Sequence, residues 1–581
     1  MSKRNGSILK AEFFRFLLPT VMSIMAMSLN EFVDSLIVSN LIDSDAMSLI
    51  TMASPLVTAY GVAYTLIGIG GSALYAIYAG RHETKKADSI FSVTLVTAMA
   101  IAFLIFAGGF VFSGPLSSSM CKATEYYSSF VPYVKGLVIS AVVIIPVQVI
   151  IYFMPAFGRP GTGTFINVIA NVVNLSMDYV FIEICGFGLE GAAYATLTGY
   201  AVGFLILLFL HLTKNLKLPF TMVKLAEFKV LIEIVSTGLS SAMNQIGYCI
   251  KIAFVNHLAF TLAGMSGVTT FSVCMQAVSM VSIFIGGVID ATLPMAAALY
   301  GQRDFSGIKL LIRTAMIVQF ISNAVALVFF EIYPQIIIHL YNVVDDMVEP
   351  ALIGLRIFSL SFIFRGFILM YMCLFPVIGR RVYAFIISLF DGFLGIIPLS
   401  LILTGTHGIN GLWEAFAILP ALMLVVILVI NLNISARSNG KYSKFMLIEK
   451  EDTSIPVFDC TIMMSREDIS NLADRIQSFC NAENIENRLS TITALVSEEM
   501  SVYTLENSKD TELKSIDIIL KIFPDHILMD FRSIGKPFDI SSIPQKDNDF
   551  SSMSVLRKAS SSFEYNYTLG MNQTRIKVER T

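Results

Sequence analysis

Long apolar runs recur through the first three quarters of the chain, and they constrain its fold more than any other feature. Between about residue 11 and residue 433, each run is close to the roughly 20 residues that a helix needs to cross a bilayer. Only 14% of the residues are charged, against about 25% in a typical soluble protein. The sequence therefore predicts an all-α polytopic membrane protein.

The runs predict twelve transmembrane helices followed by a separate C-terminal domain. The expected spans are 12–38, 49–79, 89–113, 131–156, 162–184, 189–212, 230–258, 268–300, 309–333, 350–378, 382–404 and 409–433. We divide the chain into an N-lobe (1–220, helices 1–6), a C-lobe (221–435, helices 7–12), a linker (436–454) and a polar, acidic tail domain (455–581). An even number of spans predicts that both chain ends lie on one side.

Basic residues gather in alternate loops, which predicts the orientation. Arg81 and Lys85 follow the second span, and Arg380 and Arg381 follow the tenth, whereas the intervening loops contain almost no basic residues. The positive-inside rule then places both termini and the tail domain in the cytoplasm. We expect a multi-pass protein of the cell (inner or cytoplasmic) membrane of a prokaryote.

The two halves of the hydrophobic region resemble each other. Gly80-Arg81, at the end of the second span, is matched about 221 residues later by Gly301-Gln302-Arg303, at the end of the eighth. Six spans on each side of the midpoint start in the same direction, which is a parallel repeat. Such repeats form two lobes around a central cavity, so the duplication favours a transporter without identifying the substrate.

The fifth span carries a polar stripe. Asn167, Asn171, Asn174 and Asp178 are spaced four, three and four residues apart, and therefore share one face of a helix. An ionised Asp in mid-bilayer costs about 2.5–3.5 kcal/mol, so the stripe is expected to face the bundle interior. Hydrogen bonds that only join helices are one interpretation. A site for Na⁺ or a proton, built from carboxylate, amide and hydroxyl oxygens, is the other.

Two more polar residues extend this candidate site. Asp34 lies in the first span and Thr196 in the sixth. Folding of the first six helices could gather both with Asn174 and Asp178. We therefore predict an N-lobe cation site from Asp34, Asn174, Asp178 and Thr196, with no metal other than Na⁺ at Asp34 and Asp178.

These residues carry a family resemblance. The motif P-x(14)-D from Pro19 to Asp34, the Gly-rich second span and the stretch at 158–200 resemble the multidrug and toxic-compound extrusion (MATE) family. The resemblance implies a V-shaped cavity between two lobes and cationic, amphipathic substrates. It also implies that the Asp on helix one, the Asn-x-x-x-Asp pair on helix five and the Thr on helix six couple cation entry to export.

The second lobe departs from this pattern. Some family members have a Glu on helix seven, where this chain has Asn244-Gln245. Our candidate substrate-cavity residues are Asn171, Gln245, Lys251, Asp290, Arg365 and Asp391. Snorkelling to an interface is an alternative interpretation for Lys251. Arg365 is expected to pair with Asp290 or Asp391. Because a basic cavity disfavours cationic drugs, an anionic or zwitterionic substrate remains open.

The tail predicts an α/β sandwich with helices on one face of a mixed sheet. From Glu498-Glu499, the run at 535–539 and the closing GMNQTRIKVER, it resembles the histidine-kinase-like ATPase fold in its anti-sigma-factor kinase branch. That family has a metal-binding Asn where this chain has Tyr503, and an adenine-binding Asp where it has Ser533. The nucleotide site at Glu499, Tyr503, Ser533 and Gly535 is thus interpreted as degenerate. A regulatory or partner-binding domain is expected, with a structural cap as the alternative.

The leading hypothesis is a secondary antiporter that extrudes organic, cationic or amphipathic compounds as Na⁺ or H⁺ enters. We expect no enzyme activity and no cofactor besides the coupling ion. The expected partners are membrane lipids, a small organic substrate and a cytoplasmic regulatory protein that binds the tail, but no nucleic acid. The alternatives are a flippase or exporter of an anionic lipid-linked or zwitterionic substrate, and a membrane sensor that signals through its tail.

Overall fold

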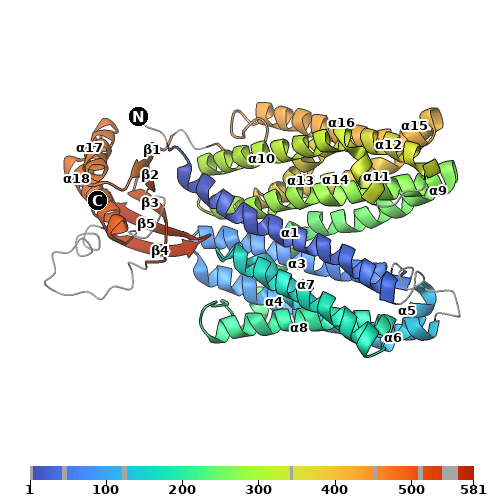
Figure 1. Cartoon of the computed structure of the whole chain (residues 1–581). Coiled ribbons are helices and arrows are strands. Elements are labelled where there is room, and N and C mark those ends of the chain that lie inside the picture. Colours follow the sequence, from blue (N-terminus) through green and yellow to red (C-terminus); the bar gives the residue numbers. More distant parts are fainter. Residues whose placement is uncertain are drawn as a thin grey trace.

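The protein is a bundle of long helices with a small α/β domain at one end (Figure 1). The structure is a computed structural model. It describes residues 4–41, 49–50, 52–120, 127–340, 345–450, 454–507, 515–538 and 560–580. The side chains of residues 31, 32 and 34–41 are not described. The helical region falls into two parts that follow the two halves of the sequence.

The N-lobe contains six long helices, which cover the six predicted spans. Its elements are α1 (Ser7–Leu41), α3 (Ser54–Gly80), α4 (Thr84–Val111), α5 (Ser113–Met120), α6 (Tyr127–Phe153), α7 (Pro160–Tyr179), the π-helical turn η1 (Val180–Ile184) and α8 (Leu189–Leu212). The short 3₁₀ helix η2 (Leu225–Lys229) leads into the second lobe. Helix α1 packs against both α7 and α9, so it lies at the seam between the lobes (Figure 1).

The C-lobe is built from more fragmented helices. Its elements are α9 (Val230–Gly301), α10 (Phe305–Ile332), α11 (Pro334–Leu340), α12 (Asp345–Ser359), α13 (Ser361–Val377), α14 (Arg381–Leu389), the π-helical turn η3 (Phe390–Leu394), α15 (Ile396–His407) and α16 (Ile409–Arg437). Helices α12 and α13 meet at a bend of 43° and together cover the predicted span 350–378.

The number of candidate membrane-spanning helices does not by itself confirm the predicted twelve. Among the described residues, ten helices are long and apolar enough to span a membrane, or eleven if the bent pair α12–α13 is one span. One of the ten is α9, whose 72 residues would measure over 100 Å if straight. Non-helical dihedral angles interrupt α9 at Ala263 and Gly264. The predicted spans 230–258 and 268–300 lie on either side of this break.

Glycines bring the two lobes into backbone contact on the side of the tail domain. A side chain on Gly80 of α3 would overlap the carbonyl oxygen of Ala298 in α9, and one on Gly301 of α9 would overlap that of Ile77 in α3. The contact is thus reciprocal between the two positions that the sequence repeat matches. Gly70 and Gly238 make a second reciprocal contact between the same helices.

The turns that follow these glycines have the same backbone geometry. His82 and Arg303 both adopt a positive φ, at 62° and 56°. The amide of His82 donates to the carbonyl of Ala79, and that of Arg303 donates to the carbonyl of Tyr300, the matching position. The offset of 221 residues in the sequence is therefore also present in the local structure.

In its described residues, the tail domain has two helices and a five-stranded sheet of order β1-β2-β3-β5-β4. Its elements are β1 (Val457–Met463), α17 (Arg466–Ala482), α18 (Asn487–Asn507), β2 (Ser515–Ile522), β3 (His526–Ile534), β4 (Ser562–Thr568) and β5 (Met571–Glu579). All the described pairings are antiparallel, so the prediction of a mixed sheet was wrong. The predicted helix after 553 lies mostly outside the described residues.

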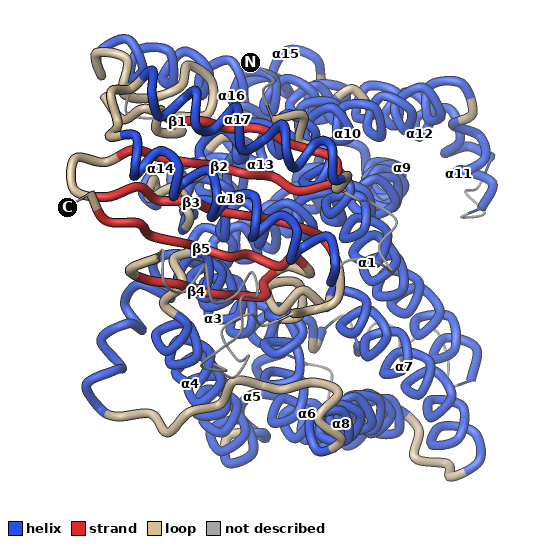
Figure 2. The backbone as a smooth tube through the Cα atoms, turned by 90° about the vertical axis from the view of Figure 1, so that its left-hand side faces the viewer, coloured by secondary structure: helices blue, strands red, loops and turns tan. Residues whose placement is uncertain are grey.

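The sheet separates the tail helices from the membrane bundle. Helices α17 and α18 cover its outer face, as predicted, and form a core with it that includes Phe458, Leu472 and Met529 (Figures 1 and 2). The opposite face lies against the end of the bundle. Figure 2 shows β1 on the side of α10 and β4 on the side of α3, so the sheet lies across the seam between the lobes.

Candidate functional site

The polar stripe of α7 faces the interior of the bundle, as its spacing predicts. Asn167, Asn171, Asn174 and Asp178 are all buried, with exposed fractions from 0 to 9%. Phe165 and Val172, on the other face of α7, are each 54% exposed. Buried polar side chains are normally hydrogen-bonded, so the side chains of this stripe should have partners on neighbouring helices of the N-lobe.

Those partners come from α1 and α8. The side-chain amide of Asn174 donates to the hydroxyl of Thr196 at 3.4 Å and accepts from the amide of Asn30 at 3.1 Å. Asp178, one turn after Asn174, is fully buried, and the helix changes to the π-helical turn η1 two residues later. Such turns are frequent at functional sites. The structure thus joins Asn174 to Thr196 and places Asp178 one turn further along the same buried face of α7, while the side chain of Asp34 lies outside the description.

Asn30 is a member of this N-lobe cluster that the sequence interpretation missed. It lies four residues before Asp34 and one before Glu31 on α1. The spacing of four, which marked Asn174 and Asp178 on α7, was present here too. The amide of Asn171 is buried as well, and its nitrogen makes no hydrogen bond among the described residues.

A cavity of about 490 Å³ lies between the lobes. Side chains from α1, α3, α6, α7 and α9 line it, and they include Gln148, Asn167, Gln245 and Asp290. Asp290 is the only lining residue with a charged side chain among the described residues. Of the six candidate cavity residues, only Gln245 and Asp290 line this space; Asn171, Lys251, Arg365 and Asp391 do not.

The C-lobe contains its own buried cluster, built around an ion pair. The ammonium of Lys251 on α9 lies 3.7 Å from the Asp391 carboxylate and donates to the Asp391 carbonyl at 2.6 Å. Asn244 donates to the same carboxylate at 3.3 Å. Both charged residues are about 5% exposed, so snorkelling does not describe Lys251. Asp391 itself lies in the π-helical turn η3.

The predicted pairing of Arg365 is seen only in part. Among the described residues Arg365 makes no direct ion pair, and the Asp391 carboxylate pairs with Lys251, although the charge of Arg365 also acts on Asp391. Lys251 takes this place because it projects from α9, whose Gly247 packs directly against Gly392 beside Asp391. Near Arg365, Gln319 and Asn323 of α10 are fully buried and hydrogen-bonded to each other at 2.9 Å. The sequence interpretation overlooked their spacing of four residues, which places both side chains on one face of α10.

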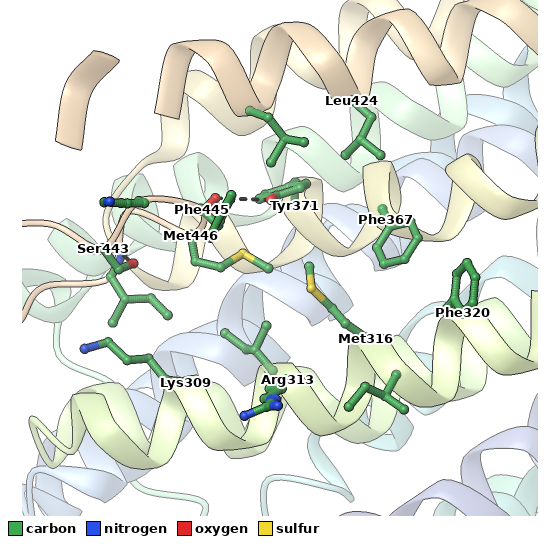
Figure 3. A pocket seen from close by; sticks show the side chains of 15 residues that line it. Lys309, Arg313, Met316, Phe320, Phe367, Tyr371, Leu424, Ser443, Phe445 and Met446 are labelled. Atoms are coloured by element: carbon green, nitrogen blue, oxygen red, sulfur yellow. Dashed lines mark hydrogen bonds between the residues drawn. The ribbon is translucent and has the colours of Figure 1, made fainter. Parts of the chain in front are cut away.

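A second hollow lies on the outside of the C-lobe, between α10, α13, α16 and the linker (Figure 3). Its volume is about 760 Å³ and its lining is mostly apolar, with Met316, Phe320 and Phe367 among the walls. The hydroxyl of Tyr371 donates to the carbonyl of Phe445 at its linker end. Phe320 is 49% exposed, so this groove opens away from the polar clusters rather than towards them.

Comparison with known families now identifies this arrangement. The family model MatE matches residues 19–180 and 237–401. The chain belongs to the MatE family.

Relatives and structures of the MatE family agree with this assignment. The chain is 21% identical to the multidrug export protein MepA of Staphylococcus haemolyticus, over 77% of this chain and 98% of the relative. It is also 21% identical to the probable multidrug resistance protein YoeA of Bacillus subtilis, over 71% of this chain and 91% of that protein.

Two solved structures share the fold. An outward-facing multidrug resistance MATE family transporter of the MOP superfamily superposes with a TM-score of 0.69 and 21% identity, covering 76% of this chain and 100% of that one. A MOP superfamily transporter from Pyrococcus furiosus superposes with a TM-score of 0.68 and 21% identity, covering 75% and 100%. Each match covers about three quarters of the chain, and the MatE model ends before the tail domain.

The tail domain contacts both halves of the MatE region. The amide of Asn566 on β4 donates to the Ala79 carbonyl at the end of α3, at 2.6 Å. Arg532 on β3 donates to the side chains of Gln302 at 2.6 Å and Asp304 at 3.1 Å, in the turn before α10. The sheet is therefore bonded to both of the repeat-related turns.

Asp304 anchors this contact. Arg4 donates to both of its carboxylate oxygens at 2.7 Å, and Arg532 pairs with it as well. Burial opposes ionisation of Asp304, but the positive charges and hydrogen bonds of Arg4 and Arg532, with the amide of Gly307, hold its pKa well below the usual value. The contact therefore depends on an ionised carboxylate between two guanidinium groups.

The tail positions expected to form a degenerate nucleotide site do not form a polar cleft among the described residues. The ring of Tyr503 on α18 packs edge-on against Phe538, with ring centroids 5.8 Å apart. Phe538 also packs beside Tyr565. Ser533 is buried in β3, and the carbonyl of Gly535 accepts a hydrogen bond from Tyr567. Glu499 is half-buried on α18.

Proposed function

We propose that this chain is a secondary antiporter that exports organic cations or amphipathic compounds in exchange for Na⁺ or H⁺. The observation that carries the proposal is a fully buried Asp178 beside the Asn30–Asn174–Thr196 hydrogen bonds, in one lobe of a two-lobe MatE fold. Its relatives MepA and YoeA are named a multidrug export protein and a probable multidrug resistance protein.

The N-lobe cluster has the chemistry of a coupling site. Amide, hydroxyl and carboxylate oxygens are hard ligands that suit Na⁺, and a buried carboxylate is an equally suitable proton carrier. Asp34, four residues after Asn30 on the same helix, would supply the second carboxylate. Ion entry at this site would bias the two lobes between their open and closed arrangements, because ligands shift conformational equilibria by differential affinity.

The central cavity supports a cationic substrate. Its volume of about 490 Å³ is within the range of small-molecule sites. Apolar side chains line it together with six Ser and Thr residues and three amides, and Asp290 makes no ion pair among the described residues. A single carboxylate in a cavity of mixed polarity favours an organic cation, which can place its charge beside Asp290 and its apolar surface against the apolar walls.

A second candidate is an exporter of anionic or zwitterionic compounds. The Pyrococcus furiosus protein of the same fold has a binding pocket of reverse polarity, which suggests a different function for that protein. Lys251 and Arg365 in the C-lobe are the residues that favour this candidate here. Against it, Lys251 is already neutralised by Asp391, and neither cation lines the central cavity.

The proposal also covers the orientation of the protein in the membrane and the role of the tail domain. The basic loops favour placing the tail-bearing end of the bundle in the cytoplasm. Because the sheet is bonded to both lobes at that end, a tail that releases one lobe would regulate opening there. This gives the tail domain a regulatory role that requires no ATP hydrolysis.

The test is ethidium efflux by purified protein in liposomes under an imposed Na⁺ or H⁺ gradient. Wild type is expected to transport ethidium under one of the two gradients. Asp290→Asn should weaken ethidium binding by about tenfold or more, since charge-assisted contacts contribute about 1.5–3 kcal/mol. Gln245→Glu, which adds a carboxylate to the same cavity, should preserve or strengthen ethidium binding.

Two outcomes would contradict the proposal. The first is no ethidium transport under either gradient by protein that remains folded. The second is export of an organic anion by wild type that is abolished by Lys251→Met and unaffected by Asp290→Asn, which would establish the second candidate.

A further inference from the structure

A basic pocket lies where the two lobes, the linker and the tail domain meet. Its volume is about 800 Å³, large enough for a nucleotide-sized ligand. Five basic residues line it, from four different segments: Arg81, Arg303, Lys441, Lys450 and Lys521. Glu449 is the only acidic lining residue among the described ones.

These basic residues come from separate segments of the chain, which distinguishes the pocket from a single basic loop between two membrane spans. Arg81 and Arg303 follow the reciprocal glycines Gly80 and Gly301, one at the end of α3 and the other after α9. Lys441 and Lys450 flank the linker hairpin, whose two ends are joined by backbone hydrogen bonding. Lys521 comes from β2 of the tail sheet. The positive-inside rule accounts for Arg81 and Arg303 but not for a basic residue on the sheet.

The protein supplies little to neutralise this charge. None of the five basic residues makes an ion pair with a described acidic residue. Among the described residues, Lys521 donates to the carbonyl of Arg303, at 3.3 Å, and Arg81 lies over the ring of Tyr78, 5.1 Å from its centroid. Like charges held this close repel one another, so a bound anion would lower the energy of the assembled tail and bundle.

Aromatic side chains share the pocket with these cations. Tyr300, Phe305 and Phe523 line it, and the turn at Asn439–Gly440 lies beside them with positive φ angles of 49° and 84°. Cations combined with aromatic faces suit a phosphorylated ligand that also carries an apolar or ring-shaped part.

We propose that this pocket binds a ligand bearing one or more phosphate groups, and that the bound ligand fastens the tail domain to both lobes. The phosphate would contact Arg81 of the N-lobe, Arg303 of the C-lobe and Lys521 of the tail at once. The same chemistry is supplied by a soluble phosphorylated compound and by the headgroup of an anionic phospholipid. The inference concerns binding at the junction and does not require that the protein transport any particular substrate.

The experiment measures binding of ATP without Mg²⁺, and of inorganic tripolyphosphate, to the full-length protein in phosphatidylcholine nanodiscs at about 0.15 M salt. Saturable binding to wild type is expected. Lys441→Gln and Lys450→Gln remove charge at exposed linker positions without disturbing a buried contact, and together should weaken binding by at least tenfold. Lys217→Gln removes one charge from an exposed loop at the same end of the bundle and should leave binding unchanged.

Nanodiscs containing phosphatidylglycerol distinguish the two sources of phosphate. If the headgroup occupies the pocket, phosphatidylglycerol should raise the melting temperature of wild type, displace tripolyphosphate and lose both effects in the Lys441→Gln/Lys450→Gln variant. If a soluble compound is the ligand, phosphatidylglycerol should leave tripolyphosphate binding unchanged.

The proposal is overturned if wild type binds neither probe and gains no stability from phosphatidylglycerol. It is equally overturned if Lys217→Gln weakens binding as much as the linker variant, because the attraction is then a property of the whole surface. Ethidium efflux that fails while phosphate binding persists would reject the proposed transport function and leave this site intact.

Discussion

The two lobes have the same type of fold, but the groups that surround the buried carboxylate in each lobe differ. In the N-lobe, Asp178 is fully buried near amide and hydroxyl groups, with Asn174 bonded to Asn30 and Thr196. In the C-lobe, Asp391 lies against the ammonium of Lys251 and the amide of Asn244. A buried charge requires compensation, and the C-lobe provides it from the chain itself.

This difference supports the proposal that the N-lobe, rather than the C-lobe, takes up the coupling ion. A carboxylate with a fixed lysine partner gains little from Na⁺ or a proton, because either must compete with the ammonium. The N-lobe cluster instead places a carboxylate near amide and hydroxyl groups, and their oxygens are ligands that suit Na⁺ or a proton.

The largest effect is expected from Asp178→Asn. Removing the N-lobe carboxylate should reduce gradient-driven ethidium efflux by about two orders of magnitude, since interactions with a charged group contribute about 1.5–3 kcal/mol. Efflux from liposomes under an imposed gradient measures this, and the melting temperature checks folding. If Asp178→Asn showed the same gradient-driven efflux as wild type, the proposed functional difference between the two lobes would be wrong.

The same substitution in the other lobe should act on stability. Asp391→Asn leaves the Lys251 ammonium buried without its counter-charge, which typically costs about 3–5 kcal/mol. Thermal unfolding should show this loss, and adding Lys251→Met should restore most of it, because a buried pair can be replaced by apolar groups. A double variant as unstable as Asp391→Asn would contradict the structural role of the pair.

The repeat-related turns provide a third contrast. Asp304 lies between Arg4 and Arg532, whereas Glu83, at the matching position, pairs only with the exposed Lys86. Asp304→Asn should weaken tail docking by about 3 kcal/mol, seen as lost hydrogen-exchange protection in β3, while Glu83→Gln should change little. Because the pKa of Asp304 is lowered by folding, docking should be constant above pH 5 and weaken only below the ordinary Asp value of about 3.9. Equal effects of the two variants would argue against this assignment.

The smallest effect is expected from Thr196→Val. The hydroxyl contributes one neutral hydrogen bond to Asn174, so its loss should weaken ion binding by about 0.5–1.5 kcal/mol, or roughly twofold to tenfold. The ion concentration for half-maximal efflux measures this change. Thr198→Val, on the same helix, removes a hydroxyl that donates only to a backbone carbonyl of its own helix and serves as the matched control.

The N-lobe was largely readable from the sequence because its polar residues keep a helical spacing within one apolar span. Asn167, Asn171, Asn174 and Asp178 predicted their own burial, and Gly80 and Gly301 predicted the repeat. Helix count and apolar length likewise indicated the family fold. Asn30 was missed because the interpretation of this span considered only the acidic residues that follow it.

The C-lobe and the tail were less predictable for physical reasons. Pairing of Lys251 with Asp391 depends on the close packing of Gly247 against Gly392, a tertiary contact that periodicity does not encode. Strand direction in the tail depends on long-range pairing, so an alternating pattern predicted the elements but not the antiparallel order. The docking of β3 on Asp304 joins residues 228 positions apart.

The most direct test of the central claim is equilibrium ion binding by purified protein. Radiolabelled Na⁺ binding and substrate-triggered proton release would be compared in wild type, Asp178→Asn and the Lys251→Met/Asp391→Asn double variant. The N-lobe account predicts that wild type and the double variant bind Na⁺ or release a proton alike, and that Asp178→Asn does neither. Ion binding retained in Asp178→Asn and lost in the double variant would place the coupling site in the C-lobe and contradict the account.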